Sequence, residues 1–399
     1  MTVDAETLLS AFQRGTTDLI EEKQLQGMIA RSLETGTPLR IKFGMDPSSP
    51  DLHLGHAVQL RKLRDLQDLG CQIVLIVGDA TAMVGDPSGK SKLRPVLTRE
   101  EVEHNLRTYT EQAGRVLDMD RTEVRRNSEW FDRMGFEELL ELTTRMTVAQ
   151  MLEREMFQTR MKNEEPIGLN EFLYPLMQGW DSVMVRSDVE LGGTDQLFNL
   201  LVGRRLQEQE EQRPQIVMTQ PLINGLDGRK MSKSYGNAVG LTADAKEMTF
   251  RIMQVDDEVM PTWLLHLTRL SLEEIEQTLA LHPREAKARL AAQVTGFYHG
   301  AEAAAEAAGA FDREVRDKVL PDDLPRVSWQ ASWGEELPLA NLLKEMGLCQ
   351  STSEARRAIK QGGVKLAGEA ERDERAAIGR PPGELLVQVG KKRAAHLVP

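Results

Sequence analysis

The chain has 399 residues, of which 40% are hydrophobic and 28% are charged, and its formal net charge is −12. This composition is ordinary for a soluble globular protein, and the length predicts two or three domains. The acidic balance argues against a protein that coats nucleic acid indiscriminately. No run reaches the ~18 apolar residues of a membrane span, and the first residues lack the pattern of a secretory signal. Cys71 and Cys349 have no metal or redox spacing, so we expect a cytoplasmic location.

The first clear pattern is a strand, helix and strand over residues 38–79. PLRIKFGMD (38–46) and CQIVLIVGD (71–79) are short apolar runs rich in β-branched residues, which favours strands. Between them, apolar residues recur at helical spacing up to Gly70. This order predicts a βαβ unit in a parallel sheet, in which ligands bind at the carboxyl ends of the strands.

The tetrad HLGH falls at that place, at the start of the predicted helix. His53 and His56 would lie beside free backbone N–H groups and the positive end of the helix dipole, which suit a phosphate. Gly55 would let a ligand approach the backbone closely. Two surface histidines that only cap a helix are the alternative, but H-x-G-H arises by chance in roughly one such chain in a hundred. The tetrad therefore indicates a nucleotide site, of a kind that several nucleotidyl transferases share.

Further along, residues 98–180 have mostly helical patterns and would interrupt the sheet. SDVELGGTDQLFNLLVGRRLQ (187–207) returns to a strand, a glycine-rich turn and a helix, and PQIVMTQPLI (214–223) is another candidate strand. Two loops carry several basic side chains. GDPSGKSKLR (85–94) is a weak signal by itself, because a solvated charged loop would look the same. The lysines of GRKMSKSYGN (228–237) could close over a pyrophosphate as it is displaced.

The last third of the chain is predicted to be helical and charged from about 242 to 315. DDLPRVSW (322–329) is expected to be a linker, and a compact segment with helix and strand patterns follows from about 335. Residues 340–399 contain 11 Lys/Arg and 7 Asp/Glu, a net charge of +4 on an otherwise acidic chain. This tail is compatible with one localised anionic partner, although a solvated tail would have the same charge.

HLGH, followed about 175 residues later by KMSKS, is the paired signature of class I aminoacyl-tRNA synthetases. The chain resembles bacterial tyrosyl-tRNA synthetases over nearly its whole length, since FGMDPSSPDLHLGH, GDPSGK, YPLMQGWD, GGTDQLFN and KMSKS occur in that family's order. The resemblance implies an α/β fold: a Rossmann-type doubly wound parallel sheet over 1–240, with a helical insertion at about 120–185. It also implies a helical anticodon-arm-binding domain over 241–320 and a small α+β RNA-binding domain of the αL fold over 335–399.

The family activates L-tyrosine with ATP to form tyrosyl-adenylate and release pyrophosphate, and it then transfers the tyrosyl group to tRNA(Tyr). The resemblance therefore implies these three partners, and Mg²⁺ is expected to accompany ATP, although no protein metal site is visible in the sequence. It also implies a homodimer formed through the inserted helices and no association with a membrane.

Site residues follow from the same resemblance. His53 and His56 would contact the ATP phosphates and the nucleotide, with Gly55 beneath the adenine. The rest of the ATP and adenylate site would be Gly44, Asp46, Ser48, Gly193, Asp195 and Gln196. The pyrophosphate would be held by Lys230, Lys233 and Ser234, assisted by Lys90 and Arg94. RNA phosphates would meet Arg356, Arg357, Lys360 and Lys365, a patch that Lys391, Lys392 and Arg393 extend.

The amino-acid pocket would consist of Thr81, Asp86, Tyr174, Gln178 and Asp181, with Asp181 at the phenolic hydroxyl. The last three have the spacing i, i+4 and i+7, which places them on one face of a helix. An ordinary polar helix face would have the same spacing. A buried carboxylate aimed at a hydroxyl rejects the analogue that lacks it, an effect for which tyrosyl-tRNA synthetases are themselves the known example.

One position departs from the family pattern. Many members have a tyrosine four residues before the Asp of the DP pair, where it helps to recognise the phenol, and here that residue is Lys42. Its side chain could point outward, or its ammonium could alter phenol recognition.

Three other functions fit part of the pattern. A tryptophanyl-tRNA synthetase shares both signatures, but the terminal RNA-binding segment and Asp181 favour tyrosine. Small-molecule adenylyltransferases with H-x-G-H are usually shorter and lack the KMSKS loop. A silent paralogue that only binds RNA is disfavoured because His53, His56 and Lys233 are all present.

Overall fold

The computed structural model describes residues 3–47, 52–87, 98–316, 324–390 and 393–399. These residues form two compact units, 1–304 and 305–399. No helix in this described part of the chain is long and apolar enough to cross a membrane.

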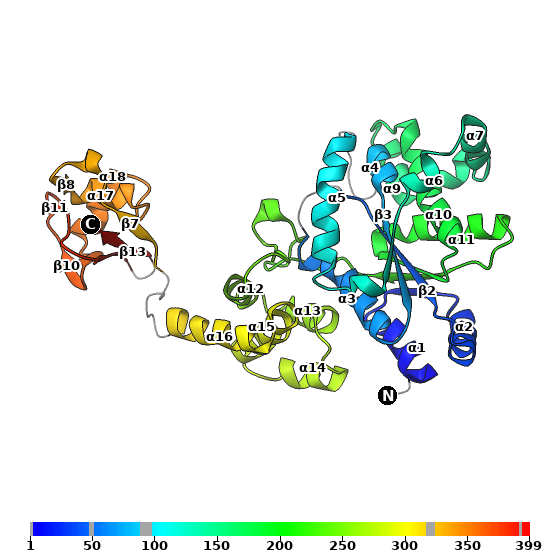
Figure 1. The fold of residues 1–399 in the computed structure, drawn as a ribbon, viewed down its shortest axis with the longest axis horizontal. Helices are drawn as coiled ribbons and strands as arrows, with labels where there is room; N and C mark the ends of the chain where they lie inside the picture. Colours follow the sequence, from blue (N-terminus) through cyan, green and yellow to red (C-terminus); the bar gives the residue numbers. More distant parts are fainter. Residues whose placement is uncertain (1–2, 48–51, 88–97, 317–323, 391–392) are drawn as a thin grey trace. The chain divides into compact units, whose positions relative to one another are not determined.

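The described residues of the first unit contain a six-stranded sheet with the order β1-β6-β5-β2-β3-β4. Figure 1 labels two of its neighbouring strands, β2 and β3. Its strands are β1 (Asp18–Ile20), β2 (Arg40–Met45), β3 (Gln72–Val77), β4 (Thr122–Arg126), β5 (Val189–Gly193) and β6 (Ile216–Gln220). The helices up to the end of the sheet are α1 (Ala5–Gln13), α2 (Glu22–Thr35), α3 (Leu54–Asp68), α4 (Asp79–Val84), α5 (Arg99–Ala113), α6 (Ser128–Phe131), α7 (Phe136–Thr144), α8 (Val148–Met151), α9 (Glu155–Lys162), α10 (Leu173–Val185) and α11 (Leu197–Gln209). Short 3₁₀ turns are η1 (Met119–Arg121), η2 (Leu169–Phe172), η3 (Thr194–Gln196) and η4 (Lys233–Tyr235).

The predicted βαβ unit and parallel sheet are confirmed. Strand β2 pairs in parallel with β3, and α3 connects them. The β5 and β6 strands predicted from 187–207 and 214–223 are also present and parallel. The exception is β1, an antiparallel edge strand that pairs with β6.

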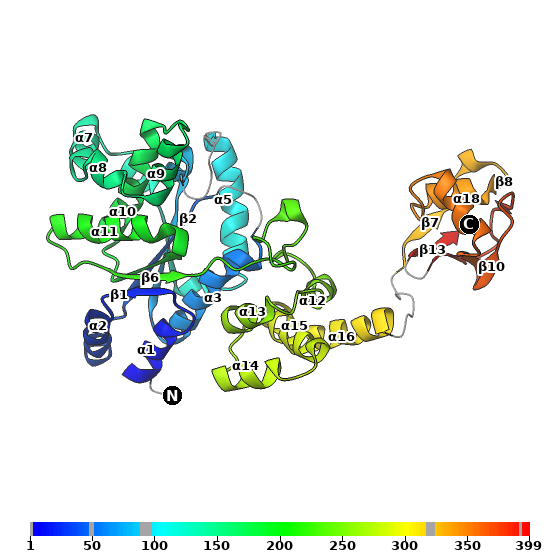
Figure 2. The ribbon, with the colours of Figure 1, turned by 180° about the vertical axis from the view of Figure 1, so that it is seen from behind.

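Alternation along β3 shows that both faces of the sheet are covered, as in a doubly wound fold. Ile73 and Leu75 belong to a large core that also contains the leucines of α3 and residues of α1 and α2. Val74 and Ile76 point to the other face, where they join Trp130 of α6 and Val185 of α10. Figure 2 shows α1, α2 and α3 grouped beside the sheet.

The segment expected to be helical between 98 and 180 contains one strand. Strand β4 pairs in parallel with β3 and forms the edge of the sheet. Its sequence, TEVRR, has one apolar residue and no alternation, so it lacks the signal by which strands are recognised. An edge strand tolerates such a sequence because one of its sides faces solvent.

The predicted helical segment after the sheet is confirmed over α12 (Ala245–Ile252), α13 (Met260–Leu267), α14 (Leu272–Leu279), α15 (Pro283–His299) and α16 (Ala301–Phe311). A π-helical turn, η5 (Asp312–Arg316), ends it. Helices α12 to α15 share the large core of the sheet, and Trp263 of α13 is completely buried there. The division into catalytic and anticodon-arm-binding domains near residue 240 stays a prediction.

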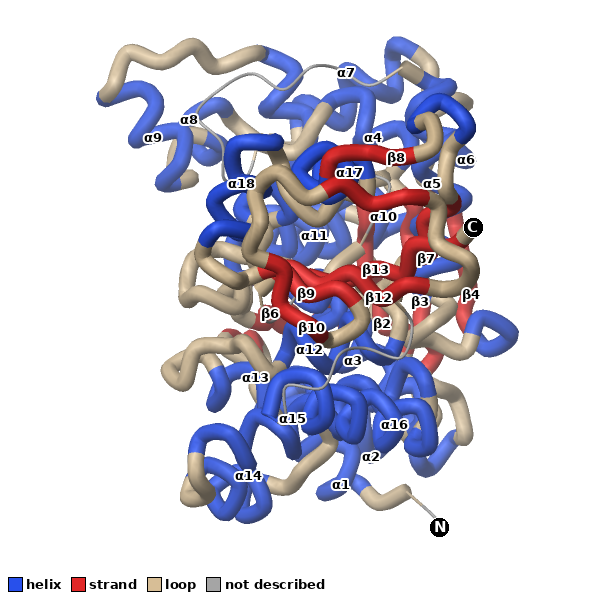
Figure 3. Tube along the Cα trace, turned by 90° about the vertical axis from the view of Figure 1, so that its left-hand side faces the viewer, coloured by secondary structure: helices blue, strands red, loops and turns tan. Residues whose placement is uncertain are grey.

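The second unit folds around two short helices, α17 (Leu339–Glu345) and α18 (Thr352–Lys360). Its strands are β7 (Arg326–Ser328), β8 (Glu336–Pro338), β9 (Val364–Leu366), β10 (Glu369–Glu371), β11 (Ala377–Gly379), β12 (Leu385–Val389) and β13 (Arg393–Val398), with a 3₁₀ turn η6 (Ala331–Trp333). The larger sheet has the order β10-β9-β12-β13-β7 (Figure 3). The prediction that 322–329 is a linker was wrong for Arg326–Ser328, because these residues form β7 and pair with the last strand of the chain.

Candidate active site

The main cavity of the first unit opens where β2 and β5 separate. Their pairing consists of Ile41 with Val189 and Lys42 with Glu190, and beyond these pairs both strands line the cavity. The change of strand order beside β2 places this cavity at the switch point where α/β sheets bind ligands. It has a volume of about 600 Å³. Of the predicted site residues, the structure brings the following to its walls: Gly44, Asp46, His53, Gly55, His56, Thr81, Asp86, Tyr174, Gln178, Asp181, Gly193, Asp195, Gln196, Lys230 and Lys233.

The HLGH segment begins α3, and its two histidines cap that helix. The Nδ1 atom of His53 accepts the N–H of Gly55 at 3.1 Å, and Nδ1 of His56 accepts the N–H of His53 at 3.2 Å. A Cβ on Gly55 would lie 2.9 Å from the His53 ring, so the fold-back of that ring requires glycine. Because both Nδ1 atoms accept, each neutral ring carries its proton on Nε2, as a donor suited to a phosphate oxygen.

The charge state of both rings is set by their position in the cavity wall. Loss of hydration lowers the pKa of His53 to about 3, and the charges of His56 and Lys233 act in the same direction. Loss of hydration and Lys233 lower the pKa of His56 to about 4, although part of that ring remains exposed. Both histidines are therefore neutral hydrogen-bonding groups near pH 7.

The KMSKS segment contacts the HLGH segment directly. The sulfur of Met231 lies 3.1 Å from the backbone nitrogen of Gly55. Five residues beyond KMSKS, the carbonyl of Val239 accepts the N–H of Leu54 at 2.9 Å. Lys230 and Lys233 line the cavity and are themselves exposed. Ser234 is not among the lining residues; Ser232 lines the cavity and shares a hydrogen bond of 2.8 Å with the Ser234 hydroxyl.

Asn237 holds this loop together from inside. It is 3% exposed, and its Oδ1 accepts the N–H of Ser232 at 2.9 Å. Its Nδ2 donates to the carboxylate of Asp227 at 2.7 Å and to the carbonyl of Lys230 at 3.2 Å. One side chain therefore fixes both ends of the segment that carries the lysines.

Helix α10 supplies the other end of the cavity. Tyr174, Gln178 and Asp181 lie on this helix, as their spacing predicted. The hydroxyl of Tyr174 donates to one oxygen of Asp46 at 2.8 Å, and the hydroxyl of Thr81 donates to the other at 2.8 Å. Asp46 follows β2, so these bonds tie the end of a central strand to α10 and α4.

Asp181 is buried, and its carboxylate is hydrogen-bonded by two neutral donors that sequence reasoning missed. Nε1 of Trp130 donates to it at 3.0 Å and Nδ2 of Asn127 at 3.3 Å. Burial raises the pKa of Asp181 to about 7, while the charge of Lys42 and these two hydrogen bonds act against the rise. Asn127, the N-cap residue of α6, and Trp130 of α6 lie about 50 residues from Asp181, so no local pattern points to them.

The last residue of β5, Gly193, and the turn after it, with Asp195 and Gln196, form a further part of the wall. Nε2 of Gln196 donates to the carboxylate of Asp86 at 2.9 Å, which joins this turn to the loop after α4. Burial raises the pKa of Asp195, and the charge of Asp86 acts in the same direction. Ser48, Lys90 and Arg94 lie outside the described residues.

The Lys42 side chain does not point outward, which was one of the two possibilities that the sequence left open. Its side chain is 0% exposed, and its ammonium is hydrogen-bonded beneath α10, 2.8 Å from the carboxylate of Glu190. Glu190 is a further residue that the sequence did not single out. The partners are separated by 148 positions, so nothing in the pattern around Lys42 predicts the pair.

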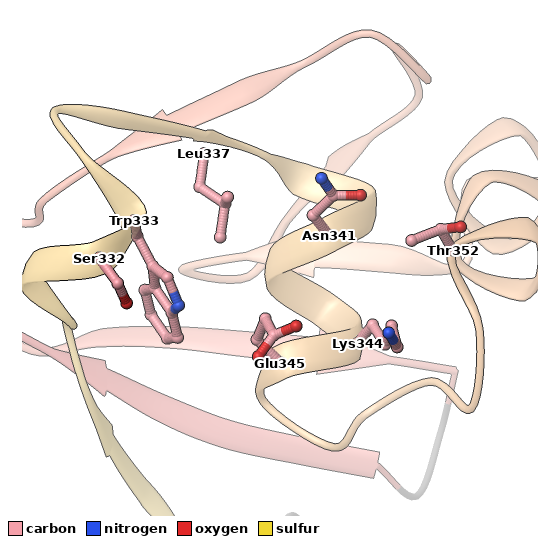
Figure 4. A pocket seen from close by; sticks show the side chains of 7 residues that line it. All are labelled: Ser332, Trp333, Leu337, Asn341, Lys344, Glu345 and Thr352. Carbon is pink, nitrogen blue, oxygen red and sulfur yellow. The ribbon is translucent and has the colours of Figure 1, made fainter.

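In the second unit, the predicted RNA-binding residues are solvent-exposed. Arg356, Arg357 and Lys360 lie on α18, and Lys365 lies on β9. Lys391 and Lys392 lie outside the described residues, and Arg393 is paired with Glu354 at 2.8 Å. A polar hollow of about 410 Å³ lies nearby between η6, α17 and the start of α18 (Figure 4). It is lined by Ser332, Trp333, Leu337, Asn341, Lys344, Glu345 and Thr352.

A Rossmann sheet whose HLGH and KMSKS segments meet at one cavity is the active-site arrangement of class I aminoacyl-tRNA synthetases. The chain belongs to that class: residues 34–315 match the family described as tRNA synthetases class I (W and Y), and residues 337–374 match the S4 domain.

Within the class, the chain is a member of the bacterial tyrosyl-tRNA synthetase family. It is 47% identical to the tyrosine–tRNA ligase of Geobacter metallireducens over 397 residues, which cover 98% of both chains. It is 47% identical to that of Thermotoga maritima, with 97% of this chain and 96% of the relative covered. For Bordetella avium the identity is 45%, over 100% of this chain and 97% of the relative.

Solved structures share the fold. A C-terminally truncated mitochondrial tyrosyl-tRNA synthetase of Aspergillus nidulans has a TM-score of 0.63 and 22% identity, with 77% of this chain and 93% of that chain covered. The Archaeoglobus fulgidus tyrosyl-tRNA synthetase, solved with L-tyrosine, has a TM-score of 0.61 and 22% identity, with 77% of this chain and 100% of that chain covered.

Proposed function

We propose that the cavity between the HLGH segment, the KMSKS segment and α10 is where tyrosine and ATP react. The chain activates tyrosine with ATP to tyrosyl-adenylate and transfers the tyrosyl group to tRNA. The observation that carries the placement is the contact between the two signatures at Gly55 and Met231, which brings Lys230 and Lys233 to the same cavity as His53 and His56. The tyrosine carboxylate attacks the α-phosphate of ATP, and pyrophosphate leaves. No covalent bond to the protein is required, so the protein acts by orienting the reactants and stabilising charge.

The amino-acid end of the cavity fits a tyrosine side chain with its hydroxyl at Asp181. The carboxylate is already oriented by Asn127 and Trp130, and an ionised carboxylate accepts the hydrogen bond that a phenol donates. Tyr174, Gln178 and Asp86 would surround the α-amino group, with Thr81 at the wall. A phenyl ring in the same place would leave the Asp181 carboxylate desolvated without that donor, which opposes phenylalanine.

The nucleotide end fits ATP along the start of α3. The Nε2–H groups of His53 and His56 would donate to phosphate oxygens, with Gly55 below the adenine. Gly193, Asp195 and Gln196 would hold the ribose and the acyl phosphate region, beside Gly44 and Asp46. Ser48 would add a hydroxyl to this end.

Pyrophosphate departure requires positive charge that arrives with the leaving group. Lys230 and Lys233 are exposed on a loop that borders the cavity, so they can close on the β- and γ-phosphates without prior desolvation. Ser234, Lys90 and Arg94 would assist them. Mg²⁺ is expected to enter with ATP, because it retains water and binds mainly through substrate phosphates.

The second unit would bind tRNA(Tyr), and the helices of 241–320 would contact the anticodon arm. The exposed basic residues of α18 and β9 supply charges for RNA phosphates on an otherwise acidic chain. We expect the cytoplasm as the location, where buried and unpaired cysteines such as Cys71 and Cys349 stay reduced.

A homodimer is supported by apolar side chains exposed along the insertion. Phe136 is 75% exposed and Leu169 is 86% exposed, which is unusual for large apolar residues on one segment. Other exposed apolar side chains of this segment are Leu140, Val148, Met161 and Met184. Sedimentation of the purified protein at micromolar concentration tests the dimer, and a mass of one chain would contradict it.

Attachment of radiolabelled tyrosine to tRNA tests the proposed function. We expect tyrosyl-tRNA to accumulate with ATP, and we expect none when Lys233 is replaced by alanine. Charging at an unchanged rate by that variant would contradict the placement of the reaction at this loop.

A further inference from the structure

Lys42 and Glu190 form a closed ion pair at the base of the active-site cavity. They are direct partners across β2 and β5, in the last pair before the strands separate. Both residues are 0% exposed. The Lys42 ammonium lies 2.8 Å from the Glu190 carboxylate, and the remaining oxygen of Glu190 accepts the hydroxyl of Ser182 at 2.9 Å.

The same ammonium is bonded to the turn of α10 that carries Asp181. It donates to the carbonyl of Gln178 at 2.7 Å and to the hydroxyl of Ser182 at 2.8 Å. With Glu190, these acceptors use all three N–H bonds of the lysine. Asp181 lies between Gln178 and Ser182 in this turn, so Lys42 fixes the backbone around it and adds a positive charge beneath it.

The groups that face Asp181 come from three sides. Asn127 and Trp130, at the start of α6 and within it, donate hydrogen bonds and are neutral. Lys42 on β2 favours the ionised carboxylate, and Glu190 on β5 opposes it. Among these four groups, Lys42 is the one with a positive charge.

We propose that Lys42 is a positioning residue for substrate selection, which keeps Asp181 a carboxylate so that the pocket accepts the tyrosine hydroxyl and excludes phenylalanine. The inference rests on the proposed function, in which Asp181 receives the phenol. Burial alone would favour the neutral acid, and the charge of Lys42 is the strongest influence against that change. Glu190 holds the ammonium in place and also accepts the side-chain amide of Gln178 at 3.2 Å. Gln178 would face the α-amino group, which tyrosine and phenylalanine share.

The charge state of Asp181 decides how strongly the pocket discriminates. A carboxylate that faces a phenyl ring has lost its water and gained no donor, which is costly. A neutral carboxyl group in the same place loses much less hydration free energy. Protonation of Asp181 should therefore reduce the preference for tyrosine over phenylalanine more than it reduces the affinity for either amino acid.

Two variants that remove the same ion pair separate this role from a merely structural one. Glu190→Gln keeps the lysine charge and an acceptor for it. Lys42→Gln combined with Glu190→Gln removes both charges and keeps amide hydrogen bonding. If the pair served only packing, the two variants would behave alike, whereas an electrostatic role predicts opposite effects on Asp181.

The experiment is ATP–pyrophosphate exchange driven by tyrosine or by phenylalanine, measured between pH 6 and pH 9.5. The ratio of the two kcat/KM values cancels the titration of the α-amino group, which both substrates share. We expect the ratio of the unmodified protein to fall as the pH drops below about 7. In Glu190→Gln that fall should move to lower pH. In the double variant the ratio at pH 7.5 should be lower by about threefold for a rise of one unit in the pKa of Asp181 from about 7, and it should recover above pH 9.

Identical pH profiles of the ratio in the two variants would overturn the inference. If the double variant does not fold, the direction of the shift in Glu190→Gln decides alone, and an upward shift or no shift overturns it. Absence of tyrosine-driven exchange in the unmodified protein would instead overturn the proposed function, so the two failures are distinguishable.

Discussion

The imidazole rings of His53 and His56 stack at the N-terminus of α3, with their centroids 4.0 Å apart. Each ring uses Nδ1 to accept a backbone N–H, and each lines the cavity. The same two side chains therefore cap the helix and line the cavity in which we propose that the nucleotide binds, a double role for two of the chain's seven histidines.

Replacing His53 and His56 by alanine should slow adenylate formation by about 100-fold to 1000-fold, because two donors to the transferring phosphate are lost. The loss of a cap should also cost about 1 kcal/mol of stability. His53→Asn is the matched control for stability, since asparagine is a good N-cap. Single-turnover adenylate formation and thermal unfolding measure the two effects. Adenylate formed at a normal rate by the double alanine variant would rule out the assigned role.

Replacing Asn237 by alanine should lower kcat for adenylate formation and leave the KM for tyrosine unchanged. The side chain joins Ser232, Asp227 and Lys230 within the loop, so its loss frees the lysines from their position without touching the amino-acid pocket. We expect a fall of about tenfold or more, because a small misplacement of groups that act on the reaction can cost up to about 100-fold. Steady-state exchange kinetics measure both constants, and a raised KM at constant kcat would show that the loop acts elsewhere.

The pH dependence of tyrosine activation should report Asp181 and not the histidines. The pKa of Asp181 is raised to about 7, so the carboxylate is present above this pH and is protonated as the pH falls through it. The pKa of His53 is lowered to about 3 and that of His56 to about 4, so both remain neutral from pH 5 to 9. We therefore expect kcat/KM for tyrosine to decline below about pH 7 through one protonation.

Two variants identify the group whose protonation causes that decline. It should be absent in Asp181→Asn, whose residual activity should be flat across the range, and it should persist in His56→Asn. The reverse result would mean that an imidazole titrates in the active site.

Replacing Arg356 and Arg357 by alanine should weaken tRNA binding without changing tyrosine activation. Both side chains are exposed on α18 and contribute charge to the second unit. If each neutralises one phosphate, the slope of log affinity against log salt should fall by about 1 per residue removed. Arg380→Ala, an exposed arginine outside α18, is the control. An equal loss of affinity in the control would show that the binding surface lies elsewhere.

Strong local patterns carried most of the fold prediction. The β2–α3–β3 unit was recognisable because its strands are continuous apolar runs and its helix has regular apolar spacing, and the HLGH turn follows from that order. Strands β4 and β7 were missed because TEVRR and RVS are short and polar and depend on a neighbouring strand for their conformation.

In the candidate site too, local patterns were predictable and tertiary contacts were not. Tyr174, Gln178 and Asp181 share one helix, so their common face could be predicted from spacing alone. Asn127, Trp130 and Glu190 could not, because they reach Asp181 or Lys42 only through tertiary packing. A buried lysine in particular is indistinguishable in sequence from a surface one until its partner is known.

Whether this cavity selects and activates tyrosine is decided by amino-acid-dependent ATP–pyrophosphate exchange. The assay is run at pH 8 with tyrosine, phenylalanine and tryptophan in turn. We predict exchange with tyrosine, with phenylalanine and tryptophan weaker by orders of magnitude. Exchange driven best by tryptophan, or no exchange with any of the three, would show that the cavity does not select tyrosine.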